Sequence, residues 1–310
     1  MASEQFPALV LDGEGQGKRA LITGLRGFTG HYLAQELTGA GYRVFGTALP
    51  GEAPGPDIYS IDICDRDAVA AMIAEIQPDV VAHLAGIANV VHANTELIYR
   101  VNIMGTRNLL EALAAQAHKP SAVLLASSAN IYGNASVGMI AETLAPAPAN
   151  DYAVSKLAME NMAQLWNDKL PIVIVRPFNY TGVGQTETFL LPKIVGHFRK
   201  GARQIELGNL AIARDFSDVR MVATSYRRLL ATSPAGQAFN VCTGQAHTLS
   251  SVIETMSGIA GYAIDVRVNP AFVRANDILT LVGNNDKLTS VIGEVKPTPL
   301  AETLRWMYQA

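Results

Sequence analysis

Cysteine, runs of like charge and long apolar stretches are scarce in this sequence of 310 residues. Its two cysteines, Cys64 and Cys242, stand far apart, with no CxxC pair and no Cys/His cluster. This pattern indicates neither a disulfide framework nor a zinc site, so we expect no metal. No apolar run approaches the ~18 residues of a membrane span. The first 17 residues also lack the basic segment and apolar core of a signal peptide, so we expect a cytoplasmic protein without a membrane partner.

The charge is low and evenly spread along the chain. The formal net charge is −3, and no lysine-rich stretch is interleaved with aromatic residues, as a nucleic-acid surface would require. We therefore expect no nucleic-acid partner. A chain of this length can bury about three quarters of the surface that its unfolded form exposes, which is enough for one large or two modest domains.

What the sequence does contain is a regular alternation of short apolar runs and longer helical patterns between Arg19 and Arg176. Such alternation is typical of a parallel sheet with helices on both faces. The pattern predicts strands at 20–23, 43–47, 58–61, 80–84, 122–127 and 172–176. It predicts helices at 29–40, 65–76, 96–117 and 151–168, with Asp65 as the N-cap of the second. Right-handed crossovers then give an α/β fold with a doubly wound parallel sheet, the Rossmann fold.

The regular alternation stops after Arg176, where a turn-rich stretch and shorter elements follow, up to a final helix near 300–308. We interpret this change as a smaller C-terminal lobe that binds the substrate. The predicted first domain covers 19–178, with 208–244 returning to it as a helix and a strand. The predicted second lobe consists of 179–207 and 245–310.

Three glycines, Gly24, Gly27 and Gly30, occupy the turn between the first predicted strand and the first predicted helix. Glycine there lets the backbone approach a pyrophosphate, whose charge then rests on the helix N-terminus. This turn predicts a dinucleotide-binding site. Asp62, after the third strand, could accept a hydrogen bond from the adenine amino group, or it could simply be an acid at a helix entry. The neighbouring residues assigned to the predicted cofactor site are Phe28, Ile63, Leu84 and the small pair Ala85 and Gly86, which closes the fourth strand.

The choice of dinucleotide depends on the end of the second strand, where NAD enzymes usually place an acid for the ribose 2′-hydroxyl. The stretch 46–49 reads Gly-Thr-Ala-Leu and contains no acid. Arg26, inside the glycine turn, could reach a 2′-phosphate, although it could also be a solvated surface residue. We therefore favour NADP(H) as the cofactor and keep NAD(H) possible.

Tyr152 and Lys156 stand four residues apart on one helix face, so both can point toward the same pocket. A nearby ammonium and an oxidised nicotinamide both favour the tyrosinate, which would let Tyr152 exchange a proton with a carbonyl or an alcohol. Ser128 follows the fifth strand, where open α/β sheets place their ligands, and its hydroxyl can hold the same oxygen. Asn102 could anchor Lys156 through a water, and Asn102, Tyr152 and Lys156 are also assigned to the predicted cofactor site. These residues predict a catalytic trio of Ser128, Tyr152 and Lys156.

Together with the glycine turn and the stretch Ile131-Tyr132-Gly133, this trio resembles the extended short-chain dehydrogenases/reductases, from about Arg19 to the C-terminus. Members of that family reduce, epimerise or dehydrate nucleotide sugars. The second half is most similar to GDP-4-dehydro-6-deoxy-D-mannose reductases and GDP-mannose 4,6-dehydratases. The matching stretches begin at Arg176, Gly182, Gly208, Arg214, Asn240 and Leu281.

The resemblance implies a set of residues that bind a GDP-linked sugar. Asn179 and Arg214 would contact the diphosphate, and Lys193 the guanine. Arg274 and Asp277 would contact the diphosphate and ribose, and Asn130 the substrate. Two positions depart from the family: Arg-Pro-x-Glu reads Arg-Ala-Asn-Asp at 274–277, and a serine that commonly faces the sugar is Ala88.

The resulting expectation is the reduction of a C4 ketone on a GDP-linked 4-keto-6-deoxy sugar by NAD(P)H, giving GDP-D-rhamnose. An epimerase, a 4,6-dehydratase and a cofactor-sensing binding protein are the alternatives. The dehydratases carry a glutamate two residues before the tyrosine of the Tyr-Gly pair, where this chain has Asn130, although Glu142 on the following loop could substitute. His83 and His92 are interpreted as structural. The family also implies a homodimer formed through the helices at 96–117 and 151–168.

Overall fold

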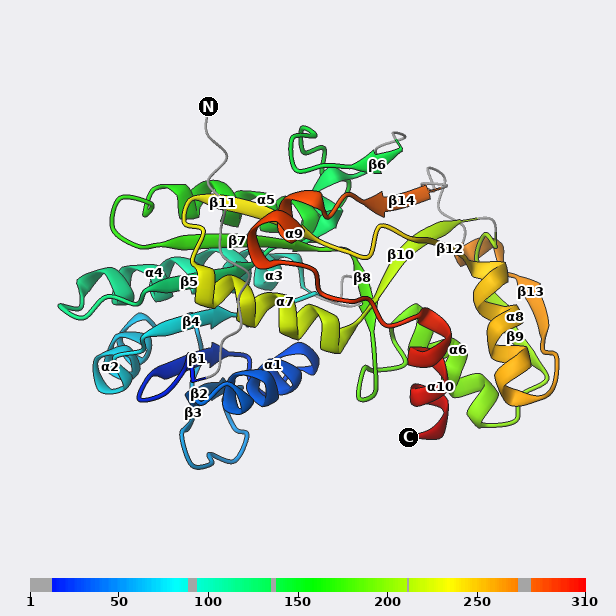
Figure 1. Cartoon of the computed structure of the whole chain (residues 1–310), viewed down its shortest axis with the longest axis horizontal. Helices are drawn as coiled ribbons and strands as arrows, with labels where there is room; N and C mark the ends of the chain where they lie inside the picture. Colours follow the sequence, from blue (N-terminus) through cyan, green and yellow to red (C-terminus); the bar gives the residue numbers. More distant parts are fainter. Residues whose placement is uncertain (1–12, 89–93, 135–137, 211, 273–279) are drawn as a thin grey trace.

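The computed structural model describes residues 13–88, 94–134, 138–210, 212–272 and 280–310. Its largest element is a parallel sheet of seven strands in the order β11-β7-β5-β4-β1-β2-β3 (Figure 1). The strands are β1 (Arg19–Thr23), β2 (Arg43–Ala48), β3 (Ile58–Ser60), β4 (Val80–His83), β5 (Ala122–Ala126), β7 (Ile172–Pro177) and β11 (Gln237–Val241). Within the sheet, the path of the chain starts at β1, proceeds outward through β2 to β3, and then returns to β4 on the other side of β1. This reversal between β1 and β4 is where a doubly wound sheet opens a crevice for a ligand.

Helices cover both faces of this sheet, and the strands show why. Along β5, Ala122 and Leu124 face one hydrophobic cluster while Val123 and Leu125 face another, so the strand reads as an uninterrupted apolar run. The first cluster lies under α1 (Phe28–Gly39), α7 (Val219–Thr232) and α9 (Asp286–Ile292). The second lies under α2 (Arg66–Ile76), α4 (Thr106–Ala115) and α5 (Asp151–Gln164).

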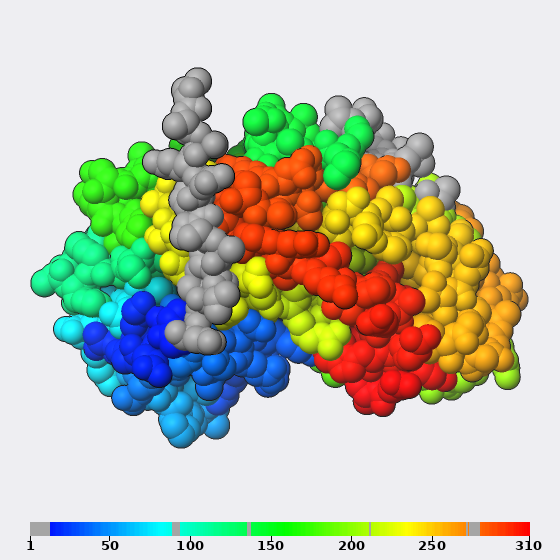
Figure 2. All heavy atoms as spheres, viewed as in Figure 1, coloured from blue at the N-terminus to red at the C-terminus, as the bar shows by residue number. Residues whose placement is uncertain are grey.

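A second group of elements lies beyond the carboxyl end of the sheet and has a hydrophobic cluster of its own. Its main strand, β10 (Ala213–Asp218), pairs with β8 (Asn179–Thr181), β12 (Ala246–Thr248) and β14 (Thr280–Gly283), and β14 pairs with β6 (Met139–Ile140). A separate pair is formed by β9 (Gln204–Leu207) and β13 (Asp265–Val268). The helices are α6 (Leu190–Arg199), α8 (Leu249–Ala260) and α10 (Leu300–Gln309), with the single turns η2 (Ala129–Tyr132) and η3 (Pro270–Phe272). Figure 2 shows the red C-terminal residues of this group packed beside its yellow and orange residues.

The predicted strands of the sheet agree with the structure to within one residue at either end. The N-cap at Asp65 is confirmed, because its carboxylate accepts from the backbone N–H groups of Asp67 and Ala68. The predicted helix at 96–117 is wrong in detail. It consists of α3 (Thr95–Tyr99), a π-helical turn η1 (Arg100–Gly105) and α4. All three are helical and follow one another without a break, so the pattern indicated one continuous helix and did not reveal the change of pitch. The helix predicted at 151–168 ends at Gln164.

The stretch after Arg176 divides between the two groups of elements. Helix α7 and strand β11 lie with the large sheet, as expected of a returning segment, because β11 pairs along its length with β7. Strand β10, within the same predicted segment, instead pairs with β8, β12 and β14. The division into a 19–178 domain and a second lobe stays a prediction.

Candidate active site

A cleft of about 330 Å³ lies at the carboxyl ends of β1, β4, β5 and β7. It is thus located at the reversal of strand order described above. Most of the residues predicted for the site lie around it. They are Gly24, Gly27, Phe28, Gly30, Leu84, Gly86, Ser128, Asn130, Tyr152, Lys156 and Asn179.

The glycine turn leaves an open cradle at one end of this cleft. Gly24 has φ +73°, and a Cβ on it would come within 3.0 Å of the Ala85 nitrogen. A Cβ on Gly30 would lie only 2.4 Å from the Gly24 carbonyl oxygen. Helix α1 begins at Phe28 with no side-chain cap and no acid in its first turn. Its free N–H groups and helix dipole can therefore receive an anionic group, and the turn fits the pyrophosphate of a dinucleotide.

Arg26 is engaged with the loop that follows β2. Its guanidinium lies 3.4 Å from a carboxylate oxygen of Glu52 and donates to the Ala53 carbonyl. The stretch 46–49 contains no acid, but the loop that follows it brings the carboxylate of Glu52 back beside the glycine turn. Sequence reasoning missed Glu52 because it lies four residues beyond the end of β2.

Asp62 and Ile63 are not among the residues that line the cleft. The Asp62 carboxylate accepts from the Cys64 N–H at 2.8 Å, which stabilises the turn before α2. Ile63 is buried against Gly105 of the π-helical turn, where an added Cβ would approach Ile63 Cγ2 to 2.6 Å. Contacts of Asp62 and Ile63 with an adenine stay a prediction.

The three predicted catalytic side chains meet in the cleft. Helix α5 begins at Asp151 because Asn150 caps it, accepting from the Ala153 N–H at 2.9 Å. Tyr152 and Lys156 thus occupy successive turns, and both are at least nine-tenths buried. Lys156 Nζ donates to the Ala126 carbonyl at 2.8 Å, at the end of β5, and lies 6.0 Å from the centre of the Tyr152 ring.

Burial is the largest cause of the pKa shifts of Tyr152 and Lys156. It raises the pKa of Tyr152 to about 12, and a hydrogen bond from Ser128 offsets only part of the rise. Burial also lowers the pKa of Lys156 to about 8, while the negative charge of Glu160 acts in the opposite direction. The expectation that Lys156 and an oxidised nicotinamide together favour the tyrosinate stays a prediction. At neutral pH Tyr152 is a neutral phenol beside a mostly protonated Lys156, a state suited to donating a proton.

Asn102 lies under the trio in the π-helical turn η1, a kind of turn that often marks functional sites. Its Oδ1 accepts from the Ile87 N–H at 2.9 Å, and its Nδ2 donates to Ser155 Oγ at 2.9 Å. A Cβ added to Gly86 would lie 3.0 Å from Asn102 Oδ1 and 3.2 Å from Lys156 Nζ. Asn102 therefore connects the end of β4 with α5, and the predicted water bridge to Lys156 stays a prediction.

His83 is a buried structural residue, as expected. Its Nδ1 lies 2.7 Å from Thr23 Oγ1 and its Nε2 lies 2.8 Å from Thr106 Oγ1. Because Thr106 donates its hydroxyl to the Asn102 carbonyl, it must accept from His83 Nε2–H, which leaves Nδ1 as the acceptor. Burial lowers the pKa of His83 to about 3, with Lys156 contributing, so the ring is neutral. His92 lies outside the described residues.

The predicted sugar-nucleotide residues fall into three sets. Asn130 and Asn179 line the cleft. Arg214 and Lys193 do not line it: Arg214 Nη1 donates to the Ala213 carbonyl, and Lys193 Nζ donates to the Glu206 carbonyl at 3.1 Å and lies 4.7 Å from the Phe272 ring centre. Arg274 and Asp277 lie outside the described residues.

Sequence reasoning missed two tyrosines of the cleft. The Tyr180 hydroxyl lies 2.7 Å from Thr29 Oγ1, and its ring stacks on Phe28. Tyr226, from the middle of α7, is 1% exposed and also lines the cleft. Tyr180 directly follows Asn179, so the family-like stretch offered a signal for it. Tyr226 offered none, because it reads as one more apolar position on an amphipathic helix.

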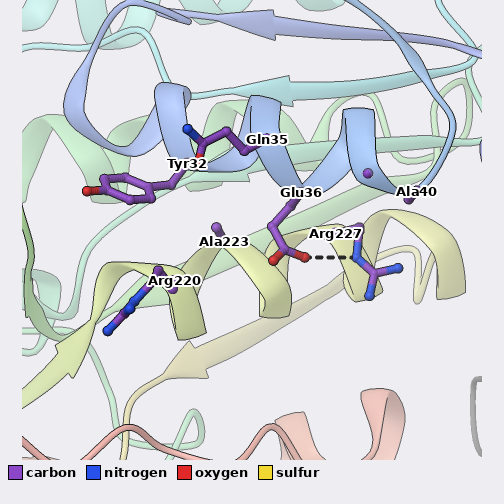
Figure 3. A pocket seen from close by; sticks show the side chains of 8 residues that line it. Tyr32, Gln35, Glu36, Ala40, Arg220, Ala223 and Arg227 are labelled. Carbon is purple, nitrogen blue, oxygen red and sulfur yellow. Dashed lines mark hydrogen bonds and ion pairs between the residues drawn. The ribbon is translucent and has the colours of Figure 1, made fainter. Parts of the chain in front are cut away.

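A more open depression of about 480 Å³ lies elsewhere, between α1 and α7 (Figure 3). Glu36 and Arg227 face each other across it at 3.1 Å. None of the predicted catalytic side chains lines it. Within the described ranges, no cluster of His, Cys, Asp and Glu could hold a metal ion. Every helix of the described part of the chain is too short or too polar to span a bilayer.

The sequence profile of the NAD dependent epimerase/dehydratase family matches residues 20–242, which contain the glycine turn, the trio and every residue that lines the cleft except Leu281. The chain belongs to this family. A solved Burkholderia cenocepacia J2315 protein, described provisionally as an epimerase, is 52% identical, with a TM-score of 0.90 over 95% of this chain and 98% of its own. The Pseudomonas aeruginosa protein RMD, solved with NADPH, is 31% identical, with a TM-score of 0.82 over 94% and 98%.

Two curated relatives cover nearly the whole chain. The GDP-6-deoxy-D-talose 4-dehydrogenase of Aggregatibacter actinomycetemcomitans is 32% identical over 295 residues, covering 94% of this chain and 97% of the relative. The GDP-6-deoxy-D-mannose reductase of Pseudomonas aeruginosa is 32% identical over 300 residues, covering 93% and 95%. These findings confirm the resemblance drawn from the motifs and the Rossmann-like fold. The chain is an NAD(P)-dependent oxidoreductase.

Proposed function

We propose that this enzyme uses NAD(P)H to reduce the C4 ketone of a nucleotide-linked 4-keto-6-deoxy hexose. The proposed reaction converts GDP-4-dehydro-6-deoxy-D-mannose to GDP-D-rhamnose. The observation that carries the proposal is the state of the trio: a buried neutral Tyr152, held next to Ser128 and Lys156, in a cleft that also presents Asn130 and Asn179. The two GDP-sugar relatives at 32% identity support the choice of substrate.

The residues of the cleft can perform each protein-borne part of this reaction. Ser128 and Tyr152 present hydroxyls to the ketone oxygen, and Tyr152 gives its proton to that oxygen as the alcohol forms. Lys156 donates a hydrogen bond to the Ala126 carbonyl, which holds its positive charge near Tyr152 while the phenol loses its proton. A bound reduced pyridine nucleotide would supply the hydride to C4.

A dehydration is less compatible with the cleft, because it needs a further acid or base for the C5 proton and the C6 hydroxyl. The position used by the dehydratases is Asn130, whose amide cannot exchange a proton near neutral pH. Glu142 was the one substitute suggested by the sequence. Its Oε1 accepts from the Asn240 N–H at 2.8 Å, and the residue does not line the cleft. We therefore infer a reductase in preference to a dehydratase.

The relatives also support two neighbouring outcomes. 6-Deoxy-D-talose and 6-deoxy-D-mannose differ only in the configuration at C4, and both named relatives act on GDP-linked forms. Delivery of hydride to the opposite face of the same ketone would give the talose product. An epimerase that retains its cofactor is the other alternative.

We further infer that NADP(H) is favoured over NAD(H), with Arg26 near the 2′-phosphate and NAD(H) still possible. Asn179 and Arg214 would hold the diphosphate and Lys193 the guanine, in agreement with the resemblance. The structure of RMD, solved with NADPH, supports the choice of NADP(H) as the cofactor.

The enzyme is also proposed to be a homodimer. Three large apolar side chains are exposed on adjoining elements: Leu97 of α3 (45%), Met104 of η1 (47%) and Val154 of α5 (38%). Because α3 and η1 both pack on α5, these side chains belong to one region of the surface. A second copy of the chain could cover it, since exposed apolar patches often mark interfaces.

The test of the proposed function is direct. Purified enzyme is given NADPH or NADH and the 4-keto sugar, freshly made by a separate GDP-mannose dehydratase, and the product is identified by NMR. We expect cofactor consumption, a GDP-6-deoxyhexose product, and no 4-keto product from GDP-mannose alone. GDP should compete far better than UDP or dTDP. A dehydrated product from GDP-mannose, or preference for UDP or dTDP, would overturn the assignment.

A further inference from the structure

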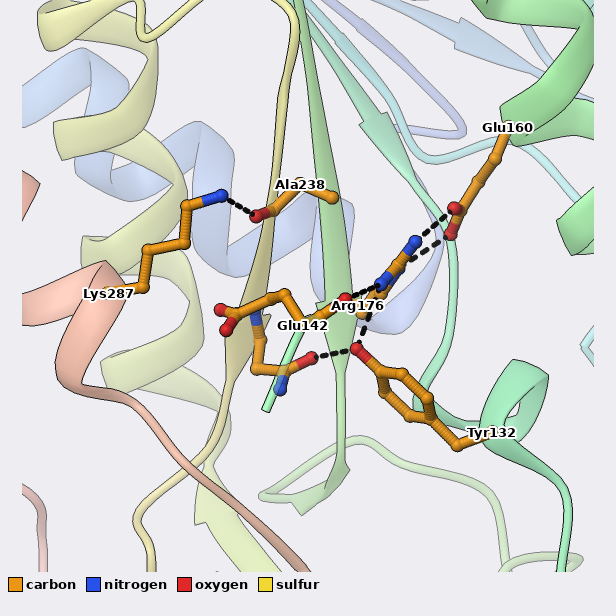
Figure 4. A network of polar contacts seen from close by, with 7 residues as sticks. Tyr132, Glu142, Glu160, Arg176, Ala238 and Lys287 are labelled. Atoms are coloured by element: carbon orange, nitrogen blue, oxygen red, sulfur yellow. Dashed lines mark hydrogen bonds and ion pairs between the residues drawn. The ribbon is translucent and has the colours of Figure 1, made fainter. Parts of the chain in front are cut away.

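Arg176 of β7 is a buried cation, 9% exposed, at the centre of a polar network (Figure 4). Its Nε and Nη2 donate to the two carboxylate oxygens of Glu160 at 3.0 and 2.7 Å. Glu160 belongs to α5 and is 3% exposed. The arginine fork therefore holds the catalytic helix from a fixed strand of the large sheet, in the bidentate geometry that is strongest and most directional for this pair.

The remaining donor nitrogen of Arg176 holds a second element. Nη1 donates to the Tyr132 hydroxyl at 2.9 Å, and that hydroxyl donates to Asn240 Oδ1 at 2.7 Å. Asn240 in turn donates to the Ile140 carbonyl at 2.8 Å. Tyr132 and Asn240 are fully buried, so every link is shielded from water. Figure 4 shows the Tyr132 side chain and Glu160 approaching Arg176 from different elements.

The two elements joined by Arg176 are those that carry the trio. Tyr132 ends the short turn η2, which begins directly after Ser128. Glu160 follows Lys156 by one turn of α5 and Tyr152 by two. The guanidinium therefore fixes the position of the Ser128 turn relative to the helix that bears Tyr152 and Lys156, although it lines no part of the cleft.

The chemistry of a buried ion pair favours a role in geometry. Desolvation cancels most of the attraction in such pairs, and apolar residues of similar size would usually serve stability equally well. What an apolar replacement cannot reproduce is a fork with directions fixed toward both α5 and η2. A displacement of about 1 Å at a reacting centre can cost about 100-fold in rate.

We propose that Arg176 and Glu160 are positioning residues, which hold Ser128 at the distance from Tyr152 and Lys156 that proton transfer to the ketone requires. The proposal rests on the proposed function only in taking that reaction as its readout. The same placement would serve any reaction of this trio.

The first arm of the test is a double-mutant cycle on turnover of the 4-keto sugar. Arg176→Met should lower kcat by about 10- to 100-fold while NADPH affinity changes by less than about 3-fold. In a Tyr152→Phe background, the same change should cost less than about 3-fold, because the proton-donating hydroxyl, whose placement relative to Ser128 the change disturbs, is already gone. Arg176→Lys keeps the charge but not the fork, and should not restore kcat.

The matched control is Arg227→Met. Arg227 also forms a partly buried ion-pair network, with Glu14 and Glu36, but contacts neither α5 nor the Ser128 turn. We expect a lower melting temperature with kcat unchanged. Equal losses from Arg176→Met in both backgrounds, or a lower melting temperature with normal kcat, would overturn the positioning role.

The second arm needs no sugar substrate and so separates this inference from the proposed function. Glu160→Gln keeps the side-chain shape but removes the negative charge that favours the charged form of Lys156. NADPH affinity is measured by fluorescence at a series of pH values, and its midpoint is the alkaline pH at which the affinity has fallen by half. This midpoint should move to lower pH in Glu160→Gln and should not move in Arg227→Met. An unchanged midpoint in Glu160→Gln would show that Glu160 does not hold its carboxylate beside Lys156 and would overturn its positioning role, even if the sugar proved not to be the substrate. Should Arg176→Met fail to fold, Glu160→Gln also replaces it in the turnover cycle.

Discussion

The contact between Arg26 and Glu52 makes the cofactor preference a quantitative prediction. The carboxylate of Glu52 lies 3.4 Å from the guanidinium that we expect to bind a 2′-phosphate. A bound NADPH must therefore take Arg26 from Glu52, whereas NADH need not. The informative changes are Glu52→Gln, which frees Arg26, and Arg26→Ala, which removes the phosphate contact.

The magnitudes follow from exposure and charge. The two side chains are 35% and 39% exposed, so their ion pair contributes about 0.2–1 kcal/mol. A hydrogen bond from arginine to a phosphate contributes about 1.5–3 kcal/mol. The phosphate should therefore win by about 1–2 kcal/mol, which corresponds to a preference for NADPH of about 5- to 30-fold.

The Glu52→Gln change should tighten NADPH binding by up to about 5-fold, the value of the pair that no longer has to be broken. Arg26→Ala should weaken NADPH binding by about 5- to 30-fold. NADH affinity should change by less than about 2-fold in either variant, because NADH makes no 2′-phosphate contact.

Fluorescence titration with NADPH and NADH gives two dissociation constants for each variant. Asp57→Asn is the matched control, because it breaks another exposed ion pair, with Arg43 at 2.8 Å, after the same strand. Equal losses of both cofactors in Arg26→Ala would indicate a folding role, and no loss would make Arg26 a solvated surface residue. Glu52→Gln could also tighten NADPH binding when Arg26 is already replaced by alanine. That result would show that the Glu52 carboxylate repels the 2′-phosphate directly and does not compete with it for Arg26.

The remaining predictions concern the trio and the dimer. Tyr152→Phe removes the transferable proton and should lower turnover by about 10²- to 10⁴-fold with little loss of NADPH affinity, whereas wild-type turnover would refute the assignment. Because the pKa of Lys156 is lowered to about 8, its charge is present below that pH and lost above it. The value of kcat/KM for NADPH should therefore fall above about pH 8, and a profile flat to pH 10 would contradict the role of the charge. Replacing both Leu97 and Met104 with glutamate should shift sedimentation from dimer to monomer, and an unchanged sedimentation coefficient would place the interface elsewhere.

The sequence alone predicted the large sheet, the glycine turn and the three side chains of the proposed trio, which the structure brings together in one cleft. The reason is that each of these is encoded over a short span of chain. In β5, consecutive residues face the two different hydrophobic clusters. Because both faces of the strand are buried, its sequence is a continuous apolar run. Tyr152 and Lys156 were found from one turn of helix, and Gly24 from a turn whose φ of +73° favours glycine.

Only the tertiary structure decided which distant residues meet at the site. Glu52 reaches Arg26 through a loop, and Glu142 is held by Asn240, 98 residues away in the sequence, so neither position follows from local pattern. Burial in the folded protein raises the pKa of Tyr152 to about 12, an effect that no spacing of residues expresses. The fork of Arg176 likewise contacts α5 and η2 only after three separate elements have packed, because a buried polar group finds its partners across the fold and not along the chain.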